Sequence, residues 1–404
     1  MYIKRALENR IREINLQFPA LIVTGSRQIG KTTMLKRIAE EERKYISLDD
    51  PMAREMARSE PALFMERYAP PVLIDEIQYA PQLLPYIKMY IDENNQVGDF
   101  WLTGSQMFHL MKDVTESLAG RVAIIQMFGL SQCELANVEN KPFIGNHEEM
   151  IERMNICKAQ KLGEVYDNIH KGTMPTVCTG KTEWGIFYSS YLNTYLQRDI
   201  KGLTQVGDEM TFMRFMSACA ARTSQMVNYA DIAKDVDISA PTAKQWLSIL
   251  VSSGIITLIQ PYFNNVLKRA IKAPNMYFMD TGLCAYLTRW DSAKTLEVSA
   301  MSGAFFETYV VTEILKSYYN EGKRPPVYYY RDTDNREIDL LLEENGILYP
   351  VEIKKSANPS KDAIKHFSVI ENTNLLRGEG SVVCLYHDVM PIDKNNWIIP
   401  AWLI

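Results

Sequence analysis

Residues 20–32 read Ala20-Leu21-Ile22-Val23-Thr24-Gly25-Ser26-Arg27-Gln28-Ile29-Gly30-Lys31-Thr32. The apolar first five residues predict a buried strand, and the next eight have the form G-x-x-x-x-G-K-T. In such a loop, glycines permit a tight turn whose backbone N–H groups surround a phosphate. Met34, Leu35 and Ile38 follow at helical spacing, which predicts a helix opening at Thr33. Strand, loop and helix in this order predict an α/β fold.

The loop residues have distinct expected roles. Lys31 is expected to reach the β- and γ-phosphate oxygens, and Thr32 to place its hydroxyl on Mg²⁺. The N-terminus of the following helix would direct its positive end at the phosphates. The predicted nucleotide-binding residues are Gly25, Ser26, Arg27, Gln28, Ile29, Gly30, Lys31, Thr32, Thr33 and, from a later strand, Ser105. The alternative, a chance glycine loop, is disfavoured by the flanking strand and helix. ATP and Mg²⁺ are therefore the predicted cofactors.

A second apolar run ends in two acids. Val72-Leu73-Ile74 leads into Asp75 and Glu76, the form of a buried parallel strand that delivers carboxylates to the edge of a sheet. We expect Asp75 to hold Mg²⁺ and Glu76 to polarise the attacking water. The alternative is a solvated strand end. The similar run at 100–105 would place Ser105 or Thr103 beside the γ-phosphate.

Arg121 follows Ser117-Leu118-Ala119-Gly120 and precedes another β-rich run at 122–127. Three roles are open for it. It would act on its own nucleotide, reach a neighbouring subunit to stabilise transition-state charge, or lie on the surface. The predicted catalytic set is Lys31, Asp75, Glu76 and Arg121.

Composition limits the class of protein. A chain of 404 residues is long enough for several domains, and 47% hydrophobic with 23% charged residues is typical of a soluble globular protein. A net charge of −5 gives no global basic signature, so DNA binding would need a local patch. The N-terminus is too charged for a secretory signal, and no stretch is apolar enough to span a membrane. The six cysteines lack zinc-ligand spacing, so we expect free thiols and a cytoplasmic location.

Five motifs together resemble a known family. GSRQIGKTT at 25–33, YISLDDP at 45–51, VLIDEIQYAP at 72–81, FWLTGSQ at 100–106 and SLAGR at 117–121 look like the AAA-type ATPases that carry a DUF4143-type C-terminal region in bacteria and archaea. Two later elements, Gly172-Thr173-Met174-Pro175 and the Y-L-x-R-D-I signature at 195–200, also match. The resemblance implies an ATPase whose partner class is undefined. Arg198 within the signature would contribute to a nucleotide site, in its own subunit or across a ring-like homo-oligomer, or cap a helix.

The middle of the chain is predicted to be helical. We expect a linker or lid at 141–212 and a winged helix-turn-helix at 213–290, with Asn228 and Ser239 capping its two central helices. Outward-facing Lys244 and Gln245, with Lys268, Arg269 and Lys272 in the wing, would contact DNA phosphates. Winged helices also serve as protein-binding modules, so a protein partner is the alternative.

The C-terminal region, 291–404, carries a second group of acids. A predicted helix at 303–319 holds Glu307, and two strands joined by the turn Asn345-Gly346 hold the rest. Asp339 lies on the first strand; Glu352 and Lys354 alternate on the second and share its face. Glu307, Asp339, Glu352 and Lys354 thus form a possible second metal site, which resembles the core of PD-(D/E)xK, restriction-endonuclease-like nucleases. The alternative is a solvated face or structural remnant.

The sequence thus predicts an α/β protein in four parts. An ATPase domain of the ASCE type with a parallel sheet spans 1–140, and the linker, winged helix and nuclease-like α/β domain follow. The leading hypothesis is Mg²⁺-dependent ATP hydrolysis coupled to DNA binding or remodelling. The alternatives are an ATP-controlled protein-interaction switch with an inactive nuclease-like domain, and an ATP-gated, metal-dependent DNA nuclease.

Overall fold

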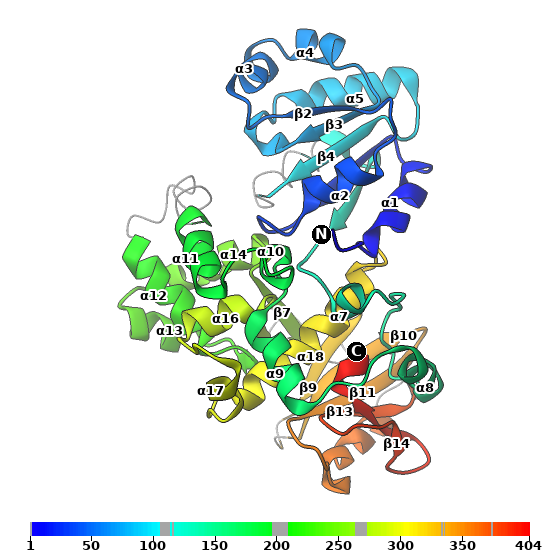
Figure 1. Ribbon diagram of the computed structural model, residues 1–404, viewed down its shortest axis with the longest axis vertical. Coiled ribbons are helices and arrows are strands. Elements are labelled where there is room, and N and C mark those ends of the chain that lie inside the picture. Colours follow the sequence, from blue (N-terminus) through cyan, green and yellow to red (C-terminus); the bar gives the residue numbers. More distant parts are fainter. Residues whose placement is uncertain are drawn as a thin grey trace.

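The computed structural model describes residues 2–105, 114, 117–195, 209–262, 273–332, 334, 336–372 and 375–404 (Figure 1). Four residues with expected roles lie outside this part of the chain: Arg198 of the signature, and Lys268, Arg269 and Lys272 of the expected wing. Among the described residues, no helix combines the length and apolarity needed to cross a membrane.

The N-terminal part contains a parallel five-stranded sheet (Figure 1). Its strands are β1 (Ala20–Thr24), β2 (Lys44–Ser47), β3 (Val72–Asp75), β4 (Phe100–Gly104) and β5 (Val122–Gln126), in the order β2-β3-β4-β1-β5. Every residue of β1, β3 and β4 is buried, which explains why these strands read as continuous apolar runs. The predicted parallel sheet is confirmed, and β4 lies between the strand of the loop and the strand of the two acids.

Helices cover both faces of this sheet. Alternate strand residues such as Leu21 and Val23 pack with α1 (Leu7–Asn15) and α2 (Lys31–Ile38). Intervening residues such as Ile22 pack instead with the helices of the other face. These helices are α3 (Pro51–Ser59), α4 (Pro61–Arg67) and α5 (Leu83–Asn94). The helix predicted to open at Thr33 in fact begins at Lys31, because Gly30 takes a left-handed conformation (φ 93°) and serves as its N-cap.

The middle of the chain is mainly helical. Its first helices are α9 (Leu162–Lys171), α10 (Pro175–Cys178), α11 (Trp184–Tyr195) and α12 (Glu209–Ala220). Then follow β6 (Gln225–Met226), α13 (Tyr229–Val236), α14 (Ala240–Ser252), β7 (Ile256–Pro261), β8 (Asn275–Phe278), α16 (Thr281–Leu287) and α17 (Ala293–Glu297). The predicted caps are confirmed: the Asn228 and Ser239 side chains accept hydrogen bonds from the first-turn amides of α13 and α14.

The C-terminal part packs α18 (Ser302–Tyr319) against a mixed sheet. Its main strands are β9 (Val327–Arg331), β10 (Glu337–Glu344), β11 (Ile347–Lys354), β13 (Gly380–Cys384) and β15 (Asn396–Pro400). The short strand β14 (Met390–Pro391) lies at the edge beside β15, and the short strand β12 (Leu376–Arg377) pairs with β11. Asn345 and Gly346 have φ of 52° and 77°, which confirms the predicted hairpin turn. The strand order β14-β15-β13-β11-β10-β9-β7-β8-β6 continues into the middle of the chain.

Two connections hold the parts together. Parallel pairing of β7 with β9 joins Gln260 to Tyr328 and makes one sheet of the middle and C-terminal strands. Short helix α7 (Gln132–Ala136) follows the ATPase-like sheet, and α8 (His147–Ile156) packs against β15 and the chain end (Figure 1). One buried apolar cluster extends from α1 through α18 to Ile404. The loop and the C-terminal sheet therefore share a continuous packed interior.

Candidate nucleotide-binding site

The loop at 25–32 has a glycine at the first and the sixth position of the G-x-x-x-x-G-K-T motif, and the backbone geometry favours glycine at both. Gly25 has φ +146°, and a Cβ placed on it would lie 2.1 Å from the carbonyl oxygen of Met127. Gly30 has φ +93° and open space around it. The first glycine thus allows close backbone approach to the end of the sheet, and the second allows the turn into α2.

Lys31 is buried inside this loop. Its side-chain ammonium group donates hydrogen bonds to the carbonyl oxygens of Gly25 and Ser26, each over 2.8 Å. The residue is 6% exposed. Phosphate oxygens bound in the loop would compete with these two carbonyl oxygens for the hydrogen bonds of the Lys31 ammonium group.

Thr32 and Asp75 meet as the two motifs predict. The Thr32 hydroxyl donates to Asp75 Oδ1 over 2.7 Å. Thr103 on β4 also donates to Asp75 Oδ1, and the Tyr45 hydroxyl donates to Asp75 Oδ2 over 3.2 Å. Because β4 lies between β1 and β3, its Thr103 is the neighbour that orients the acid.

Glu76 is held in a second hydrogen-bonded group. Its backbone is left-handed (φ 60°), and its N–H donates to Thr103 Oγ1 over 3.1 Å. The Ser105 hydroxyl and the Gln78 amide both donate to Glu76 Oε2, the former over 3.1 Å. Arg27 Nη1 lies 4.0 Å from Glu76 Oε1. Ser105, which the strand pattern predicts beside the γ-phosphate, thus contacts Glu76, and Gln78, which no motif predicts, contacts the same carboxylate oxygen.

A cavity of about 440 Å³ opens over these groups. It is lined by Arg27, Gln28, Gly30, Lys31, Thr32, Thr33, Glu76 and Thr194. Thr194 comes from α11, so the middle of the chain contributes a wall of the cavity. A smaller cavity of about 180 Å³ shares Gln28, Gly30 and Thr33 with it and extends toward Tyr2 and Pro175. Neither Thr194 nor Tyr2 carries a motif, so only the fold reveals them.

The donor set suits Mg²⁺ bound together with phosphates. Thr32 and Asp75 offer a hydroxyl and a carboxylate oxygen within hydrogen-bond contact of each other. Mg²⁺ commonly takes only one or two protein ligands and completes its shell with phosphate and water. Thr32 and Asp75 would hold the ion.

Arg121 lies far from this cavity. It directly precedes β5, which runs parallel to β1, and its carbonyl accepts a hydrogen bond from Ala20 at the start of β1. The loop follows the other end of β1, about 13 Å of strand away. Arg121 forms an ion pair with Asp92 of α5, with Nη2 donating to Oδ2 over 3.0 Å. A role for Arg121 at its own nucleotide is therefore wrong.

The C-terminal acids come together but are engaged with other groups. Tyr277 donates to Glu307 over 2.8 Å, and the Ile353 amide donates to Asp339 over 2.7 Å. Lys354 lies 2.5 Å from Glu352 and 4.0 Å from Asp339. Within the described residues, no group of three or more His, Cys, Asp or Glu side chains is arranged to hold a metal ion. The predicted second metal site at Glu307, Asp339, Glu352 and Lys354 is not assembled in this arrangement.

Burial and mutual repulsion shift the protonation of these acids. Burial, together with the Asp339 charge, raises the pKa of Glu307 and of Glu352 to about 8 each. Burial also raises the pKa of Asp339. Although burial opposes it, the charges of Asp339 and Glu352 raise the pKa of Lys354. Burial and the neighbouring carboxylates thus favour the protonated form of these acids.

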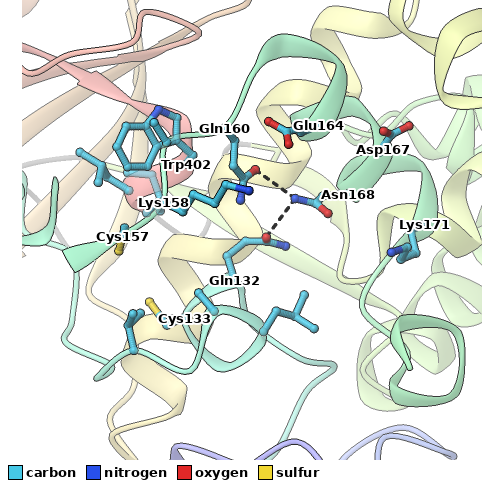
Figure 2. Close-up of a pocket in the computed structure, with 16 residues that line it drawn as sticks. Gln132, Cys133, Cys157, Lys158, Gln160, Glu164, Asp167, Asn168, Lys171 and Trp402 are labelled. Carbon is cyan, nitrogen blue, oxygen red and sulfur yellow. Dashed lines mark hydrogen bonds between the residues drawn. The ribbon is translucent and has the colours of Figure 1, made fainter. Parts of the chain in front are cut away.

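Another cavity, of about 490 Å³, lies between α7, α9 and the chain end (Figure 2). Asn168 donates hydrogen bonds to the side-chain oxygens of Gln132 and Gln160 over 3.2 and 3.0 Å. Burial raises the pKa of Cys133 to about 11 and also raises that of Cys157. No predicted site residue lines this cavity, and its thiols are protonated at neutral pH.

The predicted DNA-contacting residues are described only in part. Lys244 and Gln245 are exposed on α14, as expected. Arg222 on the same part of the chain pairs with Asp235. The described surface of α14 therefore offers one lysine to an anionic partner.

Comparisons with known proteins agree with the sequence resemblance. Residues 17–136 match the family model described as an AAA domain, and 302–404 match a domain of unknown function, DUF4143. Residues 163–294 match another domain of unknown function, DUF8612. Two uncharacterized proteins, from Mycobacterium bovis and Mycobacterium tuberculosis, are each 26% identical over 360 residues, covering 88% of this chain and 75% of the relative.

Solved structures give distant likenesses. The Walker-type ATPase of Pyrococcus abyssi is 13% identical, with a TM-score of 0.42 over 70% of this chain and 94% of its own. DnaA of Aquifex aeolicus bound to AMPPCP is 12% identical, with a TM-score of 0.30 over 60% of this chain and 84% of its own. The chain thus carries a segment that matches an AAA domain and a segment that matches DUF4143, the two parts of the family that its motifs resemble.

Proposed function

We propose that this protein binds ATP with Mg²⁺ and hydrolyses it. The observation that carries the proposal is the contact of Thr32 with Asp75 beside the Glu76 group, at the mouth of the loop that holds Lys31. These are the groups that phosphoryl transfer to water requires, namely a phosphate cradle, metal ligands and a water-polarising carboxylate.

Each of these residues would have a distinct role. Lys31 would leave the Gly25 and Ser26 carbonyls and bind phosphate oxygens, while Thr32 and Asp75 would separate to hold the ion. Bound Mg²⁺ would neutralise charge that develops on the phosphates. Glu76, oriented by Ser105 and Gln78, would polarise the attacking water.

The direct test is ATP turnover by the purified full-length protein. We expect phosphate release from ATP that requires Mg²⁺ and stops when EDTA removes it. If the protein binds ATP but does not turn it over, the proposed hydrolysis is refuted and only nucleotide binding remains. No binding of ATP would refute the proposal as a whole.

We also propose that ATP turnover is coupled to DNA through a winged helix-turn-helix. The order α12-β6-α13-α14-β7-β8, with β6, β7 and β8 in one antiparallel group, supports that fold. Exposed Lys244 on α14 supports a phosphate contact. The ATPase rate should rise with single-stranded, double-stranded or branched DNA, and binding should weaken steeply with added salt.

The described charges favour one alternative, an ATP-controlled switch that holds a protein partner. Lys354 pairs with Glu352 among the C-terminal acids, and the described surface of α14 presents a single lysine. Absence of DNA binding at low salt, with an intact ATPase, would favour the switch.

A ring-like homo-oligomer in which Arg121 reaches a neighbouring subunit is a further proposal. It predicts an ATPase rate that rises with protein concentration and is lost in Arg121→Ala.

A further inference from the structure

Arg5 lies just before α1 and is 3% exposed. Its guanidinium donates to the carbonyl oxygen of Ile29 over 2.9 Å and to that of Phe128 over 2.7 Å. Ile29 belongs to the phosphate loop, whereas Phe128 follows β5. One buried side chain therefore joins the loop to the segment that leaves the ATPase sheet.

Glu134 of α7 is the acidic partner of Arg5. The Arg5 Nε donates to Glu134 Oε1 over 2.9 Å, and both side chains are almost wholly buried, at 3% and 2% exposed. The same carboxylate accepts the backbone amides of Ala6 over 2.8 Å and Ser131 over 2.9 Å. Both charged groups of the pair thus have further hydrogen-bond partners, which is the condition under which a buried ion pair fixes geometry without leaving a charge uncompensated.

The contact with Ile29 has a consequence inside the loop. A trans peptide is planar, so the carbonyl of Ile29 and the N–H of Gly30 point in opposite directions. Arg5 holds the carbonyl on the protein side, which directs the Gly30 N–H toward the cavity that Gly30 lines. A Cβ built on Gly30 would meet nothing within 4 Å, so side-chain packing at this position does not fix the orientation of the peptide.

The segment held by Arg5 continues to the C-terminal part. The amide of Gln132 donates to Glu313 of α18 over 2.8 Å, and the Lys316 ammonium donates to the Leu130 carbonyl over 3.2 Å. Glu313 and Lys316 form a second buried ion pair, with both side chains 1% exposed. A displacement of α18 would therefore act on the segment that Arg5 binds.

We propose that Arg5 is a positioning residue for the phosphate loop. It aims the Gly30 amide at the phosphates, and its bond to Glu134 makes this alignment depend on the junction with α18. The inference rests on the proposed ATPase for its kinetic consequence, but the hold on the loop exists without nucleotide. A lysine at position 5 keeps the charge opposite Glu134 and loses the forked contact with two separate carbonyls.

The test compares Arg5→Lys with Arg43→Lys. Arg43 is a matched control because it is also buried, at 8% exposed, and donates to the Gly98 carbonyl over 2.8 Å and to Glu40 over 2.8 Å. It precedes β2, at the end of the strands opposite the loop. Both variants lose a buried guanidinium, so a general loss of stability lowers the melting temperature of both.

The kinetic readout separates alignment from stability. If Arg5 sets the fraction of loops competent to bind, Arg5→Lys should raise the KM for ATP about tenfold and change kcat by less than about threefold, because a saturating ligand restores the competent form. Arg43→Lys should leave KM within about twofold of wild type. An equal KM for the two variants would overturn the proposal, as would a fall in kcat at unchanged KM.

A second readout needs no nucleotide. Hydrogen exchange of the loop amides at 25–31 in the ligand-free protein should be faster in Arg5→Lys than in Arg43→Lys. Equal exchange in the two variants would refute the hold on the loop, whatever the kinetics. If wild type binds no ATP, the proposed function fails, and faster loop exchange in Arg5→Lys alone would still support the anchoring role.

Discussion

At the scale of single residues, Asp75 and Glu76 differ in the contacts that their carboxylates make. Asp75 accepts three side-chain hydroxyl hydrogen bonds, whereas Glu76 faces the cavity with Ser105 and Gln78 on one carboxylate oxygen. In Glu76→Gln the cavity keeps its shape, and the side chain can no longer accept a proton. We expect ATP binding within a few-fold of wild type and turnover reduced by about 10² to 10⁴.

Single-turnover phosphate release and nucleotide titration would measure these two effects separately. Glu93→Gln, an exposed change on α5, is the matched control and should behave as wild type. Wild-type turnover in Glu76→Gln would remove Glu76 from the role of base.

Gly25 limits what the loop tolerates. A Cβ there would stand 2.1 Å from a backbone carbonyl at φ +146°, so Gly25→Ala forces the loop away from β5. We expect loss of ATP binding and a lower free energy of unfolding by at least about 1 kcal/mol. Gly163→Ala, in α9 with open space around it, should instead leave stability unchanged or raise it by up to about 1 kcal/mol. Urea unfolding of both variants tests the contrast, and equal effects would contradict it.

At the scale of elements, the acids on α18, β10 and β11 predict a dependence of stability on pH. The pKa of Glu307 and of Glu352 is about 8 in the fold, above the ordinary value near 4.5. The folded state then binds more protons than the unfolded state between about pH 4.5 and 8, so stability falls as pH rises through this window.

Replacing Glu307 by Gln removes one of these titrations. Urea unfolding at pH 5, 6.5 and 8 should show a shallower loss of stability in Glu307→Gln than in wild type. Identical slopes in the two proteins would mean that Glu307 is ionised in the fold already at pH 5.

The sequence predicted individual helices, turns and strand ends better than it predicted the contacts between distant segments. The caps at Asn228 and Ser239, the turn at Asn345-Gly346 and the acids at the end of β3 each depend on a few neighbouring residues, and all are where the patterns placed them. Thr194 and the Arg5 contact depend on packing between segments more than 100 residues apart, for which a single sequence carries no periodic signal. Arg121 shows the same limit, because strand direction decides which end of the sheet it occupies.

At the scale of the whole molecule, the middle of the chain forms part of the wall of the cavity that we propose for the nucleotide. Thr194 of α11 lines the cavity, and a Cβ on Gly254, after α14, would lie 3.9 Å from the backbone nitrogen of Ser26 in the loop. A nucleotide that draws Lys31 and the loop amides toward phosphate must therefore change the contacts of both segments. We expect a non-hydrolysable ATP analogue with Mg²⁺ to slow amide exchange in the loop, in the last turn of α11 and at 253–255.

The extent of this protection shows whether the middle of the chain responds to nucleotide bound at the loop. Amides of α4, on the far face of the ATPase sheet, are the internal control and should exchange at the same rate with and without the analogue. Lys31→Ala should abolish every change, because phosphate is then not held. Protection confined to residues 25–32 would mean that the middle of the chain does not respond to nucleotide, and the coupling of ATP to any partner bound there would have to run through α7 alone.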